Sequence, residues 1–166
     1  MNKPTTDHPE VAIFPPIIPL GTLVLSIALQ WLMSLGWLAM ADPLVRMLCG
    51  AVIVAIGAFI TVSGRQALVR SGTAVNPLHP TTALVTGGIF GWSRNPLYVG
   101  VSFALCGVAL IFALDWLPLL LIPACLLMHF AVVRREERYL ERKFGDEFRR
   151  YTSHVPRYVG FQAAED

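Results

Sequence analysis

Four long apolar segments constrain the fold of this chain more than any other feature. They cover residues 17–39, 44–62, 97–114 and 117–133, and their only charged residue is Arg46, near the start of the second. About 20 apolar residues form a helix that crosses the roughly 30 Å hydrocarbon core of a bilayer. The sequence therefore predicts an all-α, polytopic integral membrane protein with four transmembrane helices. The very short turn between the last two segments makes them a C-terminal helical hairpin.

The composition agrees with a membrane protein of one domain. Hydrophobic residues make up 55% of the 166 residues and charged residues only 14%, whereas soluble domains carry about 25% charged residues. A chain of this length forms one domain, residues 1–166, and most of it is needed to cross the bilayer. Cys49, Cys106 and Cys125 lie in apolar runs without paired spacing, so we expect small core side chains rather than a disulfide or metal ligands.

Charges in the connecting segments predict the orientation. The loop 64–96 carries three arginines and no acid, and the tail 134–166 carries eight basic residues, whereas the two short turns carry Asp42 and Asp115. By the positive-inside rule, both termini and the long loop are cytoplasmic, which agrees with an even number of spans. We expect a multi-pass protein of a bacterial or archaeal inner membrane. The tail also has seven acids, so its small net charge does not favour a nucleic-acid partner.

The loop 64–96 is long for so small a protein, and loops of this length are usually functional or disordered. Its apolar residues, Ala83–Val85 and Ile89–Phe90 with Trp92, need burial. We therefore expect a packed cytoplasmic cap over a cavity at the membrane edge, with a mobile linker as the alternative. Residues 1–14 are polar and contain prolines, so we expect a flexible N-terminus.

A cation and an amide stand directly before the third apolar segment. Pro96 biases Asn95 toward an extended conformation and suits the first position of a helix. The free amides at this helix start, with Arg94 beside them, would favour a bound carboxylate. In the alternative, Arg94 only anchors the helix at the cytoplasmic surface, and Tyr98 is only an interfacial belt residue.

Two carboxylates and a histidine form a second polar cluster where the fourth segment ends. Glu136 and Glu137 either lie on a solvated helix surface or stand at a cavity mouth, where they accept hydroxyl or ammonium donors from a ligand. His129 precedes Glu136 by seven residues, which places both nearly on one helix face, about 10 Å apart. Ionisable groups within a span usually face a cavity or the bundle interior. His129 is therefore either part of the site or a neutral histidine hydrogen-bonded inside the bundle.

Other site chemistries lack support in the sequence. The glycines of the loop have no strand–turn–helix context for a dinucleotide fingerprint, and no phosphate loop with a lysine occurs. His79, His129 and His154 are scattered among different segments, so we predict no metal site.

Several short elements occur in order over about half of the chain, between Gly72 and Arg157. They are Thr82–Val85, Gly88–Phe90, Arg94–Tyr98, the pair Glu136–Glu137, Phe144–Phe148, Tyr151 and Val155–Arg157. In this order and spacing they resemble the isoprenylcysteine carboxyl methyltransferase family and its phospholipid methyltransferase relatives. An ordered set of elements is more specific than any one of them.

The resemblance implies S-adenosylmethionine as the methyl donor, held on the cytoplasmic side between the loop and the last two spans. The family's cofactor contacts fall on Thr82, Ala83, Leu84, Val85, Phe90, Asn95, Pro96, Leu97, Tyr98 and Glu136, and its second glutamate falls on Glu137. Arg94 completes the predicted cofactor-binding set. For the catalytic site we predict Arg94, Glu136 and His129.

Some positions depart from the family pattern. Asn95 stands where the family often has a histidine, so this position offers an amide and no titratable group. Phe90 and Phe148 replace tyrosines, which removes two hydroxyl groups. Val132 aligns with an arginine implicated in acceptor binding in the eukaryotic enzymes, so the resemblance does not imply the same acceptor.

The resemblance implies a methyltransferase whose lipophilic acceptor enters from the membrane lipids. An isoprenylcysteine-type carboxylate or a related lipid is the first expectation, and a phospholipid amine or a small apolar thiol is the alternative. A sulfonium methyl needs mainly alignment with its nucleophile, and no residue is a convincing general base, which favours an acceptor that needs none. Two other functions stay open: a sterol-reductase-like enzyme that uses NADPH, and a non-catalytic membrane adaptor. The sequence does not predict the oligomeric state.

Overall fold

The computed structural model describes residues 8–9 and 11–159, and within them the fold is all-helical, as predicted. The α-helices are α1 (Ile17–Leu32), α2 (Pro43–Arg70), α3 (Pro96–Phe112), α4 (Trp116–Met128), α5 (Arg134–Phe144) and α6 (Asp146–His154). Short 3-10 turns cover Leu38–Met40 and Gly88–Gly91, and a π-helical turn covers His129–Val133.

Two helical runs are long and apolar enough to cross a membrane, judged by length and composition. They are α2 and the continuous run Trp116–Phe144, which joins α4, the π turn and α5. In the latter run, the apolar part ends at Val133, before the charged residues of α5. The helices α1 and α3 are also apolar but shorter, with 16 and 17 residues. Four spans therefore stay a prediction.

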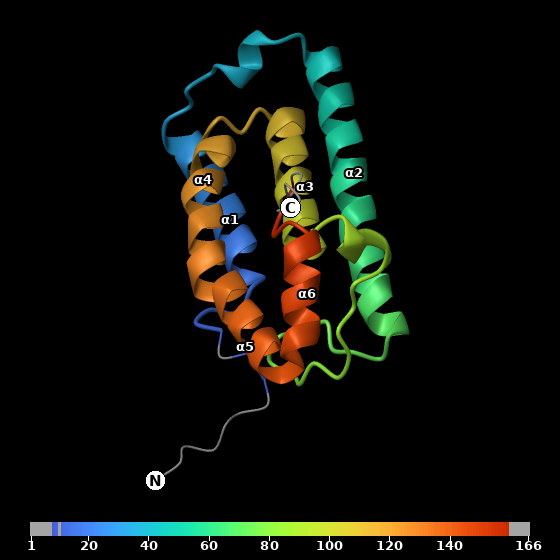
Figure 1. Cartoon of the computed structure of the whole chain (residues 1–166). Coiled ribbons are helices and arrows are strands. Elements are labelled where there is room, and N and C mark those ends of the chain that lie inside the picture. Colours follow the sequence, from blue (N-terminus) through green and yellow to red (C-terminus); the bar gives the residue numbers. More distant parts are fainter. Residues whose placement is uncertain (1–7, 10, 160–166) are drawn as a thin grey trace.

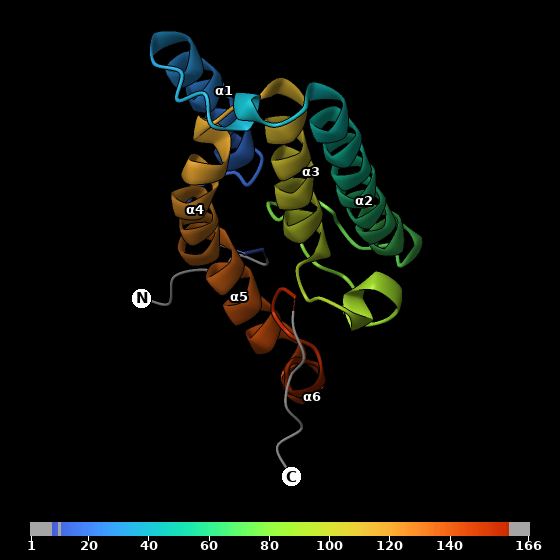
Figure 2. The ribbon, with the colours of Figure 1, turned by 90° about the horizontal axis from the view of Figure 1, so that it is seen from above.

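The apolar helices form two antiparallel pairs, α1 with α4 and α2 with α3 (Figure 2). Figure 1 shows the loop 71–95, α5 and the start of α3 at one end of these pairs, and the short connections 33–42 and 113–115 at the other end. Polar and charged segments far apart in the sequence are thereby collected at one end of the bundle.

Glycines allow α2 and α3 to pack backbone against backbone. A Cβ atom built on Gly57 would lie 2.5 Å from the carbonyl oxygen of Gly100, and one on Gly50 would lie 2.7 Å from that of Gly107. Small residues at helix contacts let backbones approach closely in lipid. Ala51, Ala55 and Ala58 of the same helix do not take part in this contact and are exposed.

The first helix ends at Leu32, not at Ala39 as predicted, because the chain turns around a buried carboxylate. Asp115 is fully buried and accepts hydrogen bonds from the backbone amides of Gly36 (2.7 Å) and Leu38 (2.8 Å). Gly36 has a φ of +77°, a conformation that glycine adopts without strain. Asp115, expected as a charge in an exposed turn, is therefore a structural anchor.

Two other boundaries differ from the prediction. The second helix continues to Arg70 instead of ending at Val62, because no proline interrupts it and Gly64 is held inside the helix by its packing against Pro96 and Leu97. The loop is correspondingly shorter, residues 71–95. The tail from Arg134 is mostly helical, as α5 and α6.

The N-terminal segment also differs from the flexible segment predicted for residues 1–14. Val11 and Ile13 pack against the core, and the amide of Ala12 donates to the carbonyl of Ala131 (3.0 Å). Residues 1–7 and 10 lie outside the described part of the chain.

The cysteines, expected as small core side chains, are exposed on the helices. An outward position suits an apolar residue when the helix faces lipid rather than water.

Candidate functional site

A small cavity of about 130 Å³ lies where the loop 71–95, the start of α3 and α5 meet. Most of the predicted cofactor-binding residues line it: Ala83, Leu84, Val85, Phe90, Arg94, Asn95, Pro96, Leu97, Tyr98, Glu136 and Glu137. Thr82 does not line the cavity; its hydroxyl donates to the carbonyl of Gly72, and its amide donates to Thr73 Oγ1. The structure thus brings Arg94 and Asn95 together with Glu136 and Glu137.

Glu136 faces the start of α3. The hydroxyl of Tyr98 donates to Glu136 Oε1 at 2.8 Å, across a sequence separation of 38 residues. Burial, helped by the neighbouring charge of Glu137, raises the pKa of Glu136 to about 7, while the hydrogen bond from Tyr98 opposes this shift. Glu136 therefore changes its charge close to neutral pH.

Glu137 is held by two arginines. Both its carboxylate oxygens accept from Arg157, with Nη2 at 2.7 Å from Oε2, and Arg94 Nη1 lies 3.4 Å from Oε1. The side chains of Arg94 and Glu137 are only 12% and 13% exposed, so water screens this contact much less than a surface ion pair. Hydrogen bonding to Glu137 raises the pKa of Arg157, whereas burial lowers that of Arg94. One carboxylate thus organises both cations.

Arg94 also has an unused donor. Its Nε atom is buried and has no hydrogen-bond partner among the described residues. Buried donors are almost always paired. An acceptor supplied by a ligand in the adjoining small cavity would satisfy this atom.

The C-terminal strap, residues 155–159, covers the start of α3. The amide of Arg94 donates to the carbonyl of Pro156 (3.0 Å), and Asn95 Nδ2 donates to the carbonyl of Arg157 (3.0 Å). Asn95, which replaces the family's histidine, therefore uses its amide to hold the strap. The start of α3 follows the prediction: Pro96 is its first residue.

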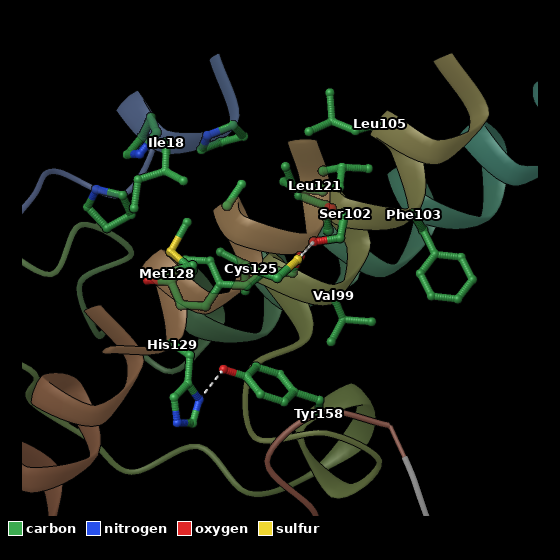
Figure 3. A pocket seen from close by; sticks show the side chains of 18 of the residues that line it. Ile18, Val99, Ser102, Phe103, Leu105, Leu121, Cys125, Met128, His129 and Tyr158 are labelled. Atoms are coloured by element: carbon green, nitrogen blue, oxygen red, sulfur yellow. Dashed lines mark hydrogen bonds between the residues drawn. The ribbon is translucent and has the colours of Figure 1, made fainter. Parts of the chain in front are cut away.

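A second, larger cavity of about 850 Å³ lies beside the small one (Figure 3). Apolar side chains of α1, α3 and α4 form most of its wall, including Ile18, Leu105, Leu121 and Met128. Few polar groups reach it, which suits the hydrocarbon part of a ligand.

The two cavities adjoin at Tyr98. Val75, Pro77, Leu97 and Tyr98 line both of them. The Tyr98 side chain thus has the apolar cavity on one side and Glu136, in the small cavity, on the other.

His129 lies in the apolar cavity, not in the small one, so the structure does not bring it together with Arg94 and Glu136. Its Nδ1 atom is 2.9 Å from the hydroxyl of Tyr158, and Figure 3 shows the two side chains pointing toward one another. The seven-residue spacing to Glu136 misled because the intervening residues form a π turn, which rotates the helix faces relative to a regular α-helix.

Sequence reasoning placed neither Arg157 nor Tyr158 in the site. Both follow the last helix, in a segment without periodicity. The only signal was the element Val155–Arg157 of the family resemblance, which contains Arg157 but not Tyr158. Tyr139 was missed as well, and Tyr151 was named only as an element of the family resemblance. Tyr139 accepts from the amide of Thr81 (3.2 Å), and Tyr151 donates to the carbonyl of Phe90 (2.7 Å), so both hold the loop to the last two helices.

A comparison with protein families gives one match. The sequence model described as phospholipid methyltransferase matches residues 45–147, more than half of the chain. No curated protein and no solved structure shows a significant match to this chain.

Proposed function

The chain belongs to the phospholipid methyltransferase family, and from this premise we propose that it transfers a methyl group from S-adenosylmethionine to a lipophilic acceptor at the membrane surface. The observation that carries the proposal is the junction at Tyr98, where a small cavity with charged walls adjoins a large apolar one. A water-soluble donor and a membrane-soluble acceptor need two such environments side by side.

The small cavity offers groups of the right chemistry for the donor. The methionine part of S-adenosylmethionine carries a carboxylate and an ammonium group. The unused Nε of Arg94 can donate a hydrogen bond to the carboxylate, and Glu136 can accept hydrogen bonds from the ammonium group. When bound, the donor supplies an electrophilic methyl group. The surrounding chain supplies apolar contacts from Ala83–Val85 and Phe90.

The small cavity must widen to admit this donor. Its volume of about 130 Å³ is below the roughly 300–1,000 Å³ of sites that hold drug-sized ligands. Residues of the loop 71–95 form much of its lining, so we infer that this loop moves when the donor binds.

The proposed membrane topology determines from which side the acceptor enters. We propose four spans, α1 to α4 with the π turn, with both termini, the loop 71–95 as a cap and the tail in the cytoplasm. The apolar cavity between α3 and α4 would then receive the hydrocarbon chain from the lipid, and the reacting group would reach Tyr98. Exclusion of water from this junction leaves the nucleophile poorly solvated and aligned with the methyl group.

The acceptor group is a carboxylate of isoprenylcysteine type or, as the second candidate, a phospholipid amine. The description of the matching family favours the amine. An amine attacks only when neutral, so this acceptor has to enter the junction without its ammonium proton, whereas a carboxylate needs no deprotonation.

Isothermal calorimetry with S-adenosylmethionine tests the donor site. We expect Glu136→Gln and Arg94→Ala each to weaken binding about 10- to 100-fold, the loss of one charge-assisted hydrogen bond. The matched controls, Glu147→Gln and Arg142→Ala, change exposed residues of α6 and α5 that do not line the small cavity, and should bind normally. Equal affinity in all four variants, each folded in detergent, would rule out this donor site.

A further inference from the structure

A third cavity, of about 290 Å³, lies outside the two cavities used above and is dominated by arginine. We call it the arginine cavity. Its lining consists of Arg94, Arg134, Arg138, Arg149, Arg157, Glu137, Glu141, Phe148 and Thr152. Five cations against two acids leave a formal charge of +3 in one small space.

The two acids do not neutralise all of these cations. Glu137 is shared between Arg94 and Arg157, and Arg149 is paired with Glu141 (3.2 Å) and with Asp146 (3.0 Å), which does not line the cavity. Within the described chain, Arg134 and Arg138 have no carboxylate within ion-pair distance. Arg138 Nε donates to the backbone carbonyl of Arg134, which leaves its terminal nitrogens free for another acceptor.

Guanidinium groups that face one another without an anion repel, and a bound anion removes this repulsion. Phosphate is the anion that best fits, because its oxygens accept the parallel hydrogen bonds that guanidinium groups donate. Arg134 and Arg138 stand on two successive turns of α5, directly after the predicted fourth span, so the proposed topology places them near the lipid phosphates.

We propose that the arginine cavity binds a phosphate-bearing anion, either the headgroup of an anionic lipid or free phosphate. Arg134 and Arg138 donate to the phosphate oxygens, and the arginines paired with carboxylates, Arg94, Arg149 and Arg157, add positive charge around them. Arg94 and Glu137 line both this cavity and the small one, so the anion lies across this ion pair from the donor site. The proposal does not depend on the methyl-transfer activity.

The test compares two double variants of equal charge. Arg138→Gln with Arg149→Gln removes two cavity arginines, whereas the control, Arg142→Gln with Arg150→Gln, removes two exposed arginines of the same two helices that do not line the cavity. In detergent, inorganic phosphate replaces chloride at constant ionic strength, and the rise in melting temperature gives the affinity. In a second arm, nanodiscs of phosphatidylcholine with or without phosphatidylglycerol are used, and the phosphatidylglycerol retained by the extracted protein is quantified.

We expect the natural protein and the control pair to respond alike. We expect the cavity pair to bind the anion at least about tenfold more weakly in at least one arm, because it loses the charge-assisted hydrogen bonds of Arg138 and the charge of Arg149. If the two pairs differ in the phosphate arm, free phosphate is sufficient to occupy the cavity. If they differ in the nanodisc arm alone, the ligand is the lipid headgroup. If the cavity pair and the control pair bind the anion equally well in both arms, the anion is attracted only to the basic surface in general, and the proposal fails. The single variant Arg138→Gln replaces the cavity pair should the latter not fold.

Discussion

Glu136 is the residue whose chemistry depends most on where the fold places it. In the sequence it is one acid of a charged helix, and in the structure it lies against Tyr98 with a pKa of about 7. The same side chain can thus be an anion that holds a cationic ligand or a neutral acid, within the physiological range of pH.

This position makes donor binding depend on pH. If the ionised carboxylate of Glu136 binds the ammonium of S-adenosylmethionine, affinity is full above pH 7 and falls as pH drops through 7. Each unit below the pKa should then weaken binding by up to about tenfold. Calorimetry between pH 5.5 and 7 measures this, since the α-amino group of the donor stays protonated there.

The matched variant for this prediction is Glu136→Gln, whose affinity should be low and flat over the same range. A natural protein with no change of affinity between pH 5.5 and 7, or a variant that keeps the full pH dependence, would show that Glu136 does not bind the donor.

At the residue scale, the sequence identified the groups that lie close to one another in the chain and missed those that depend on the tail. Arg94–Tyr98 and Glu136–Glu137 form compact motifs, and the structure brings them into one cavity. Arg157 contacts Glu137 from 20 residues away, and Tyr158 contacts His129 from 29 residues away. Both contacts depend on how α6 and the strap turn back, which no local pattern encodes.

Among the elements, the packing of α2 on α3 positions the site most directly, because α3 begins at the small cavity. The glycine contacts bring the two backbones so close that any side chain must displace one helix. A displacement at Gly57 would move the start of α3, and with it Tyr98 relative to Glu136.

Gly57→Ala should therefore destabilise the protein. The new Cβ would lie 2.5 Å from both the amide nitrogen of Ala104 and the carbonyl oxygen of Gly100, and such overpacking costs about 1–3 kcal/mol. The measurement is the melting temperature in detergent, which should fall. The control is Gly21→Ala in α1, where a Cβ meets nothing within 4 Å and stability should be unchanged or higher. Equal melting temperatures for the two variants would contradict the close contact.

Hydropathy predicted which segments are helical but not where each helix stops. The third segment, 97–114, matches α3 closely, because Asn95 and Pro96 give a local start signal. The first predicted segment extends beyond its helix. After Leu32 the chain turns, because the amides of Gly36 and Leu38 donate hydrogen bonds to Asp115, about 80 positions later. Local periodicity cannot predict long-range hydrogen bonds to one buried carboxylate.

For the whole molecule, the directions of the helices agree with the proposed topology. The connection 33–42 lies at the end of the bundle opposite to the loop 71–95 and α5 (Figure 1). The same end carries Arg65 and Arg70 at the end of α2, Arg94 in the loop and the eight basic residues of the tail, so it is predicted to be cytoplasmic.

Thiol labelling checks this topology. In a background with Cys49, Cys106 and Cys125 changed to serine, Met40→Cys should react with a membrane-impermeant maleimide added to spheroplasts, because Met40 is 88% exposed in the outer connection. Arg142→Cys should react only after the membrane is permeabilised. The opposite pattern, or equal labelling of both positions, would overturn the proposed orientation.

The central claim is that methyl groups pass from a donor in the small cavity to an acceptor in the apolar cavity, at Tyr98. The most direct measurement incubates the purified protein and extracted membrane lipids with S-adenosylmethionine that carries an isotope-labelled methyl group, and analyses the lipid fraction by mass spectrometry. We predict labelled lipid, and about 100-fold less label with Glu136→Gln. If the acceptor is a carboxylate, the label is a methyl ester, which base hydrolyses. If the acceptor is an amine, the label is an N-methyl group, which is stable to base. Absence of label from every lipid under conditions where the donor binds would contradict the account.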